Sequence, residues 1–319
     1  MTFIAGVDQF RFNSFSNAMI LQAQQEESFL RHTLTMETIE GQKRFFDALG
    51  TVSFHERTGE NEPLTFSEIT RDRRFISRRD FAFADRWDWR KDTDYKHFIE
   101  PNSMYMMAVS AAWGRQFDEV VIEALDGTSY SGETGATPVV FDTNMDVDIQ
   151  WGEQYVIVDD GVAYGGPTSD VTMVDTGTDQ GHNIGKIRQA LKLLRRNNVN
   201  KNRKLYHVSH PDAIDDLLNY ERAIDERKAL LSRMQDVVDG LEPNFMGMEI
   251  ITTTLMPQAK AFVYTDRVMV GGMGHSDMKV RLDEIPQTGH TRQLAVYGSG
   301  AATRRLEDEI VRINLDVAA

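Results

Sequence analysis

The sequence "DTNMDVDIQWGE" (142–153) carries oxygen-bearing side chains at the spacing of a calcium-binding loop. Positions 1, 3, 5, 7 and 12 of that pattern are occupied by Asp142, Asn144, Asp146, Asp148 and Glu153. Position 6, which needs glycine for a sharp turn, is Val147, and no helix is expected on either side. The alternative is a strand with Val147, Ile149 and Trp151 facing inward and a solvated Asp side. The residues favour the strand.

A second candidate for metal chemistry is the pair His207 and His210, three positions apart and near Asp212. The pair spans an expected strand end and helix start, so the two rings do not share a helical face as zinc ligands would. A partly buried His207 and a His210 in the capping region of the helix are favoured. The chain has no GxSxG, P-loop or GxGxxG motif, and its abundant carboxylates single out no acid/base pair. We therefore predict a protein that is not an enzyme, with no cofactor and no metal site.

The third candidate is "RDRRFISRRDFAFADRWDWR" (71–90), in which seven arginines alternate with aromatic residues. The stretch has three interpretations: a nucleic-acid platform, an intramolecular sheet, and a strand pair lying across a neighbouring subunit whose acidic surface meets the arginines. The third is favoured, because the aromatic residues alternate like a buried strand face and four Asp dilute the positive field. The predicted inter-subunit residues are Arg71, Arg73, Arg74, Phe75, Arg78, Arg79, Phe81, Phe83, Trp87 and Trp89.

Bulk composition narrows the protein class. The 319 residues suggest one large or two moderate domains, and the net charge of −14 argues against a dedicated DNA-binding protein. No cysteine is present, which excludes disulfides and thiolate chemistry. We find no apolar run of membrane-spanning length and no signal-peptide pattern at the N-terminus, and so expect no membrane association and a cytosolic product.

The elements that position these residues follow from periodicity. Residues 1–50 are loosely patterned and are interpreted as an extended arm, followed by a long two-stranded excursion over 51–90. Residues 101–127 form the clearest helix, with one apolar stripe made of Trp113, Phe117, Val120, Val121 and Ala124. Pro101 and Asn102 or Ser103 mark its start, and Gly127 its end.

The rest of the chain alternates between strands and helices before becoming β-rich. Short strands are expected within the Gly/Thr/Asp-rich stretch 128–181. A helix through Ile184, Ile187, Leu191 and Leu194, a buried strand at 204–209 and a helix from 209 with Ser209 and Asp212 at capping-box spacing come next. A further helix is expected over about 221–238, and the pattern of the C-terminal third predicts strands.

This order of elements, together with several sequence segments, resembles the major capsid proteins of tailed bacteriophages of the Hong Kong 97 type, particularly those of short-tailed phages. The segment "AAWGRQFDEVVIEALDGTSYSGETGATPVVF" (111–141) is similar to the end of that family's spine helix and its following loop. The segment "IGKIRQALKLLRRNNVNKNRKLYHVSHPDAIDDLL" (184–218) is similar to the start of its A-domain. Two more, "VDGLEPNFMGMEIITTTLMP" (238–257) and "GAATRRLEDEIVRINLD" (300–316), are similar to its returning and closing strands.

The resemblance implies an α+β fold and a division of the chain. The implied parts are an N-terminal arm (1–50), an E-loop β-hairpin (51–98), a P-domain with the spine helix (99–180), an A-domain (181–272) and returning strands that complete the A- and P-domains (273–319). Some relatives cross-link their shells through an E-loop lysine, but no lysine occurs here between Lys43 and Lys91, so we do not expect that chemistry. A separate scaffolding protein and no maturation cleavage are also expected.

The resemblance also implies the function. The chain is expected to be a virion protein, assembled in the host cytoplasm, whose copies form hexamers and pentamers of an icosahedral head around double-stranded DNA touched nonspecifically. Its expected partners are other copies of itself, scaffolding protein and portal protein, with decoration proteins as a further candidate. Alternatives are an encapsulin-like compartment shell, a metal-dependent enzyme built on 142–153 or the His207/His210 pair, and a nucleic-acid-binding module using 71–90.

Overall fold

The computed structural model describes residues 25, 27–50, 52, 54–56, 66, 69, 71–87, 104–148, 156–157, 173–174, 181–223, 244–285 and 291–315. The chain forms two compact units. Unit 1 comprises Met1–Ser28, Ala82–Phe117 and Met278–Gly298. Unit 2 comprises Phe29–Phe81, Asp118–Asp277 and Ser299–Ala319.

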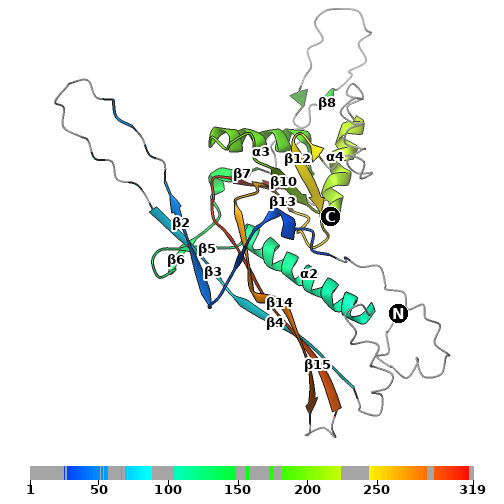
Figure 1. Ribbon diagram of the computed structural model, residues 1–319. Helices are drawn as coiled ribbons and strands as arrows, with labels where there is room; N and C mark the ends of the chain where they lie inside the picture. The colour runs from blue at the N-terminus through cyan, green and yellow to red at the C-terminus, as the bar shows by residue number, and fades with distance from the viewer. Residues whose placement is uncertain are drawn as a thin grey trace, which may run out of the picture. The chain divides into compact units, whose positions relative to one another are not determined.

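Helices and strands both contribute to the described part of the chain (Figure 1). The helices are α2 (Met104–Asp126), α3 (Ile184–Arg196) and α4 (Pro211–Ala223), with 3-10 turns η2 (Arg31–Thr33) and η5 (Thr143–Met145). The strands are β1 (Thr35–Thr38), β2 (Lys43–Leu49), β3 (Arg71–Ser77), β4 (Arg79–Trp87), β5 (Ser129–Ser131), β6 (Thr137–Val139), β7 (Asp146–Val147), β8 (Val156–Ile157), β9 (Met173–Val174), β10 (Leu205–Ser209), β11 (Asn244–Phe245), β12 (Met248–Thr252), β13 (Lys260–Thr265), β14 (Met269–Ile285), β15 (Thr291–Arg304) and β16 (Ile310–Asn314). The predicted α+β class is confirmed.

The largest sheet has the order β11-β12-β10-β13-β16-β7 and lies in unit 2. Its pairings are mixed: β10 runs parallel to β12 and antiparallel to β13, and β16 runs parallel to β7. The central strands are almost continuously buried, as in Val208, Phe262 and Val263. Such runs are typical of strands that are covered on both faces. The other described sheets have the orders β1-β14-β15-β4, β2-β3-β5-β6 and β8-β9.

Helix α3 packs on β16 and β7 of this sheet. Its buried stripe contains Ile187, Leu191 and Leu194, which confirms the predicted helix. The Asn183 side chain caps the N-terminus by accepting a hydrogen bond from the backbone N–H of Lys186 (2.8 Å). At the other end, Asn198 adopts φ 57° and the Val199 N–H reaches back to the Leu194 carbonyl, which is the geometry of a Schellman stop.

Helix α2 also confirms its prediction: it has 23 residues, a length of about 35 Å. Phe117, Val120 and Val121 of the predicted stripe are buried. The buried Asp118 carboxylate accepts hydrogen bonds from the backbone N–H groups of Phe29 (2.9 Å) and Leu30 (3.2 Å). These bonds fasten the segment before η2 to the helix.

The sequence predicts no strand within the extended arm 1–50, but residues 31–49 have regular structure. That stretch contains η2, β1 and β2, and β2 pairs antiparallel with β3 from Lys43↔Ser77 to Leu49↔Arg71. The β2 sequence KRFFDAL alternates in burial, and its half-buried Phe46 packs on a small core of Ile39, Ile76 and Ala301. The strand pair therefore begins before residue 51. The domain boundaries themselves stay a prediction.

Residues 71–87 form two strands in different sheets, β3 and β4, rather than one arm of the two-stranded excursion expected over 51–90. The break is at Arg78, whose backbone N–H donates to the Gln42 carbonyl (2.9 Å). β3 joins β2, and β4 lies at the edge of the sheet containing β14 and β15. The capping box predicted at Ser209 is also wrong: its hydroxyl is buried without a partner among the described residues, and the Asp212 N–H donates to His210 Nδ1 (3.3 Å).

Candidate inter-subunit surface

Arg74, one of the predicted interface residues, is buried within its own subunit. Its guanidinium donates to Ser129 Oγ (2.7 Å), Glu307 Oε1 (3.3 Å) and Asp72 Oδ2 (2.9 Å). Three elements far apart in the sequence thus meet at one side chain. Arg74 holds β3 to the rest of unit 2.

Phe75 is likewise buried by its own chain. Its ring lies 5.8 Å from the ring of Phe45 and 5.9 Å from that of Tyr130, and the Lys43 ammonium lies 4.5 Å from its centre. Lys43 and Phe45 belong to β2, and Tyr130 belongs to β5. Phe75 therefore contributes to the packing of the β2-β3-β5-β6 sheet.

Gly135 makes this packing possible. It has φ +70°, and a Cβ built on it would lie 2.1 Å from a ring carbon of Phe75. Both the backbone conformation and the space favour glycine. We expect Gly135→Ala to lower the free energy of unfolding by about 1–3 kcal/mol, measured by urea denaturation. Gly41→Ala, where a Cβ meets nothing within 4 Å, is the matched control, and equal losses in both variants would refute this account.

The exposed arginines of β3 and β4 already have acidic partners in their own chain. Arg73 binds both oxygens of Asp47 (2.6 and 3.2 Å), its cross-strand neighbour in β2. This hydrogen bond lowers the pKa of Asp47 and raises that of Arg73. Arg79 pairs with Glu123 of α2 (2.5 Å). Exposed pairs of this kind contribute little stability, and their arginines can exchange with other carboxylates.

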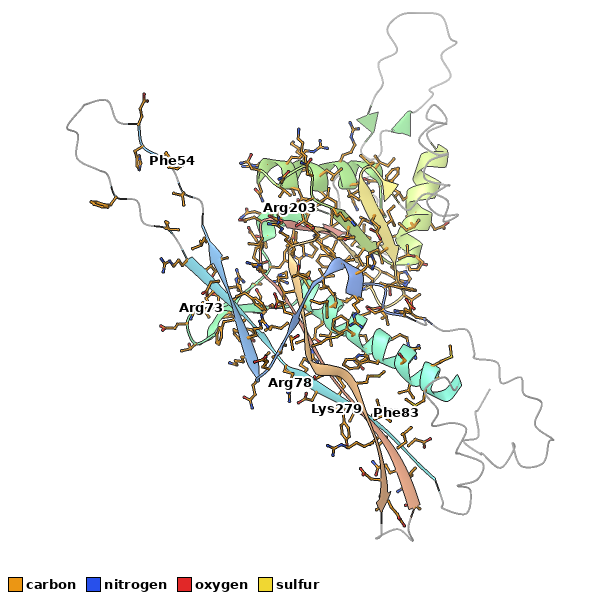
Figure 2. The ribbon with its side chains drawn as sticks, in the orientation of Figure 1. Phe54, Arg73, Arg78, Phe83, Arg203 and Lys279 are labelled. Atoms are coloured by element: carbon orange, nitrogen blue, oxygen red, sulfur yellow. The ribbon has the colours of Figure 1, made fainter. Side chains whose placement is uncertain are left out.

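The remaining predicted residues differ in their environment. Arg78 pairs with Asp80 at the break between β3 and β4 (3.0 Å), and Arg71 is exposed at the start of β3. On β4, Phe81 is half-buried and Phe83 is exposed. Figure 2 shows Arg73 on the β2–β3 pair. The Trp87 side chain and Trp89 lie outside the described residues.

A group of exposed apolar side chains, not identified from the sequence, lies just before this stretch. We call it the apolar segment: Phe45, Leu49, Val52, Phe54, Phe66 and Ile69. Phe54 is 99% and Phe66 is 92% exposed, and Figure 2 shows Phe54 beyond the end of β2. Six large apolar residues exposed within 25 positions are unusual for a monomer. The sequence does contain a signal for this group: Val52 and Phe54 precede the polar turn sequence RTGENEP (57–63), and Phe66 and Ile69 follow it.

In the acidic run 142–153, the carboxylates of Asp142 and Asp146 bind groups of their own chain, whereas Asp148 is exposed. Asp142 accepts from the backbone N–H and side-chain amide of Asn144 (3.0 and 2.9 Å), which starts η5. Both oxygens of Asp146 are bound by Arg312 (2.9 and 2.6 Å). Val147 is buried, as the strand interpretation predicted. Ile149, Trp151 and Glu153 lie outside the described residues.

His207 and His210 are not brought together. His207 is buried, and its Nε2 lies 2.9 Å from Nε2 of His182, with the rings 10° from parallel. Burial lowers the pKa of His207 to about 4, and burial with the nearby His207 and Lys186 lowers that of His182. His210 lies at the start of α4.

In the described part of the chain, no group of three or more His, Asp or Glu is arranged to hold a metal ion. No described helix is long and apolar enough to cross a membrane.

Comparison with known proteins identifies one family over almost the whole chain and several solved structures with a similar fold. A family model described as phage capsid protein matches residues 7–317, whereas no curated protein matches the chain. The fold is similar to the capsid structure of the Cyanophage P-SCSP1u, with a TM-score of 0.62 and 13% identity over 97% of this chain and 94% of that one. It is also similar to a capsid structure of Helicobacter pylori bacteriophage KHP30, with a TM-score of 0.63 and 8% identity over 96% and 95%. A structure of Mycobacterium phage Che8 gives 0.59 and 12% identity over 95% and 96%.

Proposed function

Because the chain belongs to the phage capsid protein family, we propose that it forms hexamers and pentamers of an icosahedral head that encloses double-stranded DNA. The proposal takes the protein to be structural rather than catalytic. Its proposed partners are further copies, a scaffolding protein, portal protein and decoration proteins, and its proposed site of assembly is the host cytoplasm.

The observation that carries this proposal is the apolar segment. Phe54 and Phe66 expose nearly their whole side chains, and Leu49 exposes 72%. Burying each of these side chains in a contact is worth about 1.5–3 kcal/mol. Another copy of the chain is the partner that a shell supplies at every position, and closed symmetry repeats a modest contact many times.

The arginines of β3 and β4 fit a role in setting register at such a contact. Arg73 and Arg79 are exposed and held by carboxylates of their own chain, so a neighbour's carboxylate can replace or join these partners. Phe83, Trp87 and Trp89 remain proposed contact residues. Arg74 and Phe75, which are buried, are proposed to act indirectly by holding β3 in place.

The test is a variant that removes apolar surface without disturbing the fold. We expect Phe54→Ser with Phe66→Ser to leave a folded, soluble subunit that forms no closed shells in negative-stain electron microscopy, because both side chains touch almost nothing within the subunit. Phe83→Ala with Trp87→Ala is a second arm with the same expected result.

Val140→Ser is the control for this experiment, since Val140 is 70% exposed but lies outside the apolar segment. It should assemble as the parent does. Normal particles from both double variants would refute the assignment of these residues to a contact between copies. Particles filled with enzymes rather than DNA would instead favour a compartment shell.

A further inference from the structure

The region around α3 has a charge opposite to that of the chain. Between Gln180 and Pro211 the sequence contains eight Lys or Arg and no Asp or Glu, so this stretch carries +8 and the rest of the chain must carry −22 to give −14. Two of the eight cations have structural partners. Lys186 is buried and donates to the carbonyls of Gly181 (3.0 Å) and Asn314 (3.1 Å), and Arg203 binds Glu309 (2.8 and 2.6 Å).

The other six cations form what we call the α3 basic surface: Arg188, Lys192, Arg195, Arg196, Lys201 and Lys204. The first four stand at i, i+4, i+7 and i+8, opposite the buried stripe of α3, and the last two follow in the connection to β10. All six are exposed, and none forms an ion pair with another described residue. Figure 1 shows α3 and β10 together, and Figure 2 places Arg203 beside α3.

Helix stability explains only part of this arrangement. Arg195 and Arg196 lie in the last turn, where cations interact favourably with the helix dipole. Arg188 lies two turns earlier, and Lys201 and Lys204 lie beyond the helix end. These three gain nothing from the dipole, since its effect is confined to the last turn. Their exposure and common charge therefore point to a polyanion outside the subunit.

We propose that the α3 basic surface binds the phosphate backbone of double-stranded nucleic acid. This inference rests on the proposed function and identifies the face of the subunit that meets the packaged DNA. From Arg188 to Arg196 the helix rises about 12 Å, which matches roughly seven phosphate charges along a duplex axis. Asn198 and Asn202 add exposed amides, a side-chain type that also contacts phosphates.

The composition of this surface favours a duplex backbone over other partners. Among the described side chains of 181–217, no large apolar residue is exposed, so the surface lacks the apolar centre of a protein–protein contact, where lysine is depleted. It also lacks exposed aromatic rings, which single-stranded nucleic acid needs for stacking. Binding by six cations without such contacts is expected to be independent of sequence and sensitive to salt.

The experiment measures binding of the full-length subunit to a fluorescent duplex oligonucleotide by anisotropy at several KCl concentrations. The variant is Arg188→Gln with Lys192→Gln and Lys201→Gln. The control is Arg267→Gln with Lys279→Gln and Arg281→Gln, which removes the same charge from exposed positions elsewhere. For the variant we expect affinity to fall at least tenfold at low salt, and the slope of log affinity against log salt to decrease in magnitude by about 2–3. The control should stay within about twofold of the parent.

Three results would overturn the proposal. Equal binding by the variant and the parent would remove the α3 basic surface from DNA contact. Equal losses in variant and control would mean that overall charge, not this surface, determines binding. Tighter binding of the parent to poly-glutamate than to the duplex would identify an acidic protein as the partner. Shell formation, scored separately by electron microscopy, tests the proposed function. A failure of the DNA-binding proposal can therefore be distinguished from a failure of the proposed capsid function.

Discussion

Replacing Arg304 by methionine is expected to lower the free energy of unfolding of the subunit by about 3 kcal/mol or more. The Arg304 side chain is fully buried at the C-terminus of α2, where its guanidinium donates to the carbonyls of Ala124 (3.1 Å) and Leu125 (2.8 Å). Its Nε also donates to Glu307 (3.0 Å). Methionine fills a similar volume but leaves two helix-end carbonyls and one oxygen of the partly buried Glu307 carboxylate without the Arg304 donor.

Urea denaturation followed by circular dichroism measures this loss. The neighbouring Arg305→Met is the control: Arg305 is half-buried, and its backbone N–H, which the substitution keeps, bonds to the Val268 carbonyl (2.7 Å). We expect the control to change stability by less than about 1 kcal/mol. Similar losses of unfolding free energy in both variants would show that the hydrogen bonds of Arg304 to the end of α2 and to Glu307 do not stabilise the subunit.

The second large effect is loss of stability in acid through the buried pair His182 and His207. Burial lowers the pKa of His207 from 6.5 to about 4, so its ring is neutral in the folded subunit down to that pH. The unfolded chain takes up a proton near pH 6.5, so stability that is fully present above this pH is lost as pH falls to about 4. The contribution of His207 alone is about 3 kcal/mol. His182, whose pKa is also lowered, acts in the same direction.

Lys186 adds to this effect, because its positive charge opposes protonation of His182. We expect His207→Gln to make the loss of stability between pH 7 and pH 4.5 about 2–3 kcal/mol smaller than in the parent, measured from urea midpoints across that range. His32→Gln is the control, because the His32 side chain is exposed and its Nε2 lies 3.0 Å from Glu249 Oε1. A pH dependence in His207→Gln that equals the parent's would contradict the assignment.

Elements with a strong local pattern could be predicted from the sequence. Helix α2 follows from one apolar stripe and a terminal glycine, and α3 follows from Ile187, Leu191 and Leu194 at helical spacing. The strand β10 is a short apolar run between polar residues, and its burial agrees with that pattern. These elements are specified by residues that are close together in the chain.

The missed features depend on residues that are far apart. Arg74 is buried against Ser129 and Glu307, which follow it by 55 and 233 positions, and no local pattern records that contact. His182 and His207 pair across 25 positions, whereas the visible spacing pointed to His207 and His210. The strand β2 was missed because it lies in a polar context, and its partner β3 fixes its register.

The burial of the predicted interface residues could not be derived from the sequence for a related reason. Alternating aromatic residues predict which side chains share a face, but not whether the subunit itself covers that face. Phe75 is covered by Phe45 and Tyr130, whereas Phe54 is covered by nothing in the described subunit. Surface left for another copy can be recognised only after the intramolecular packing is known.

Electron microscopy of the full-length protein, expressed with the products of the neighbouring genes, tests the central claim most directly. The claim is that the apolar segment of each copy is covered by another copy. The account predicts closed shells in which Phe54 and Phe66 lie against an adjacent subunit. Particles in which these side chains face solvent, or a protein that sediments as a single copy at high concentration and forms no shells, would contradict it.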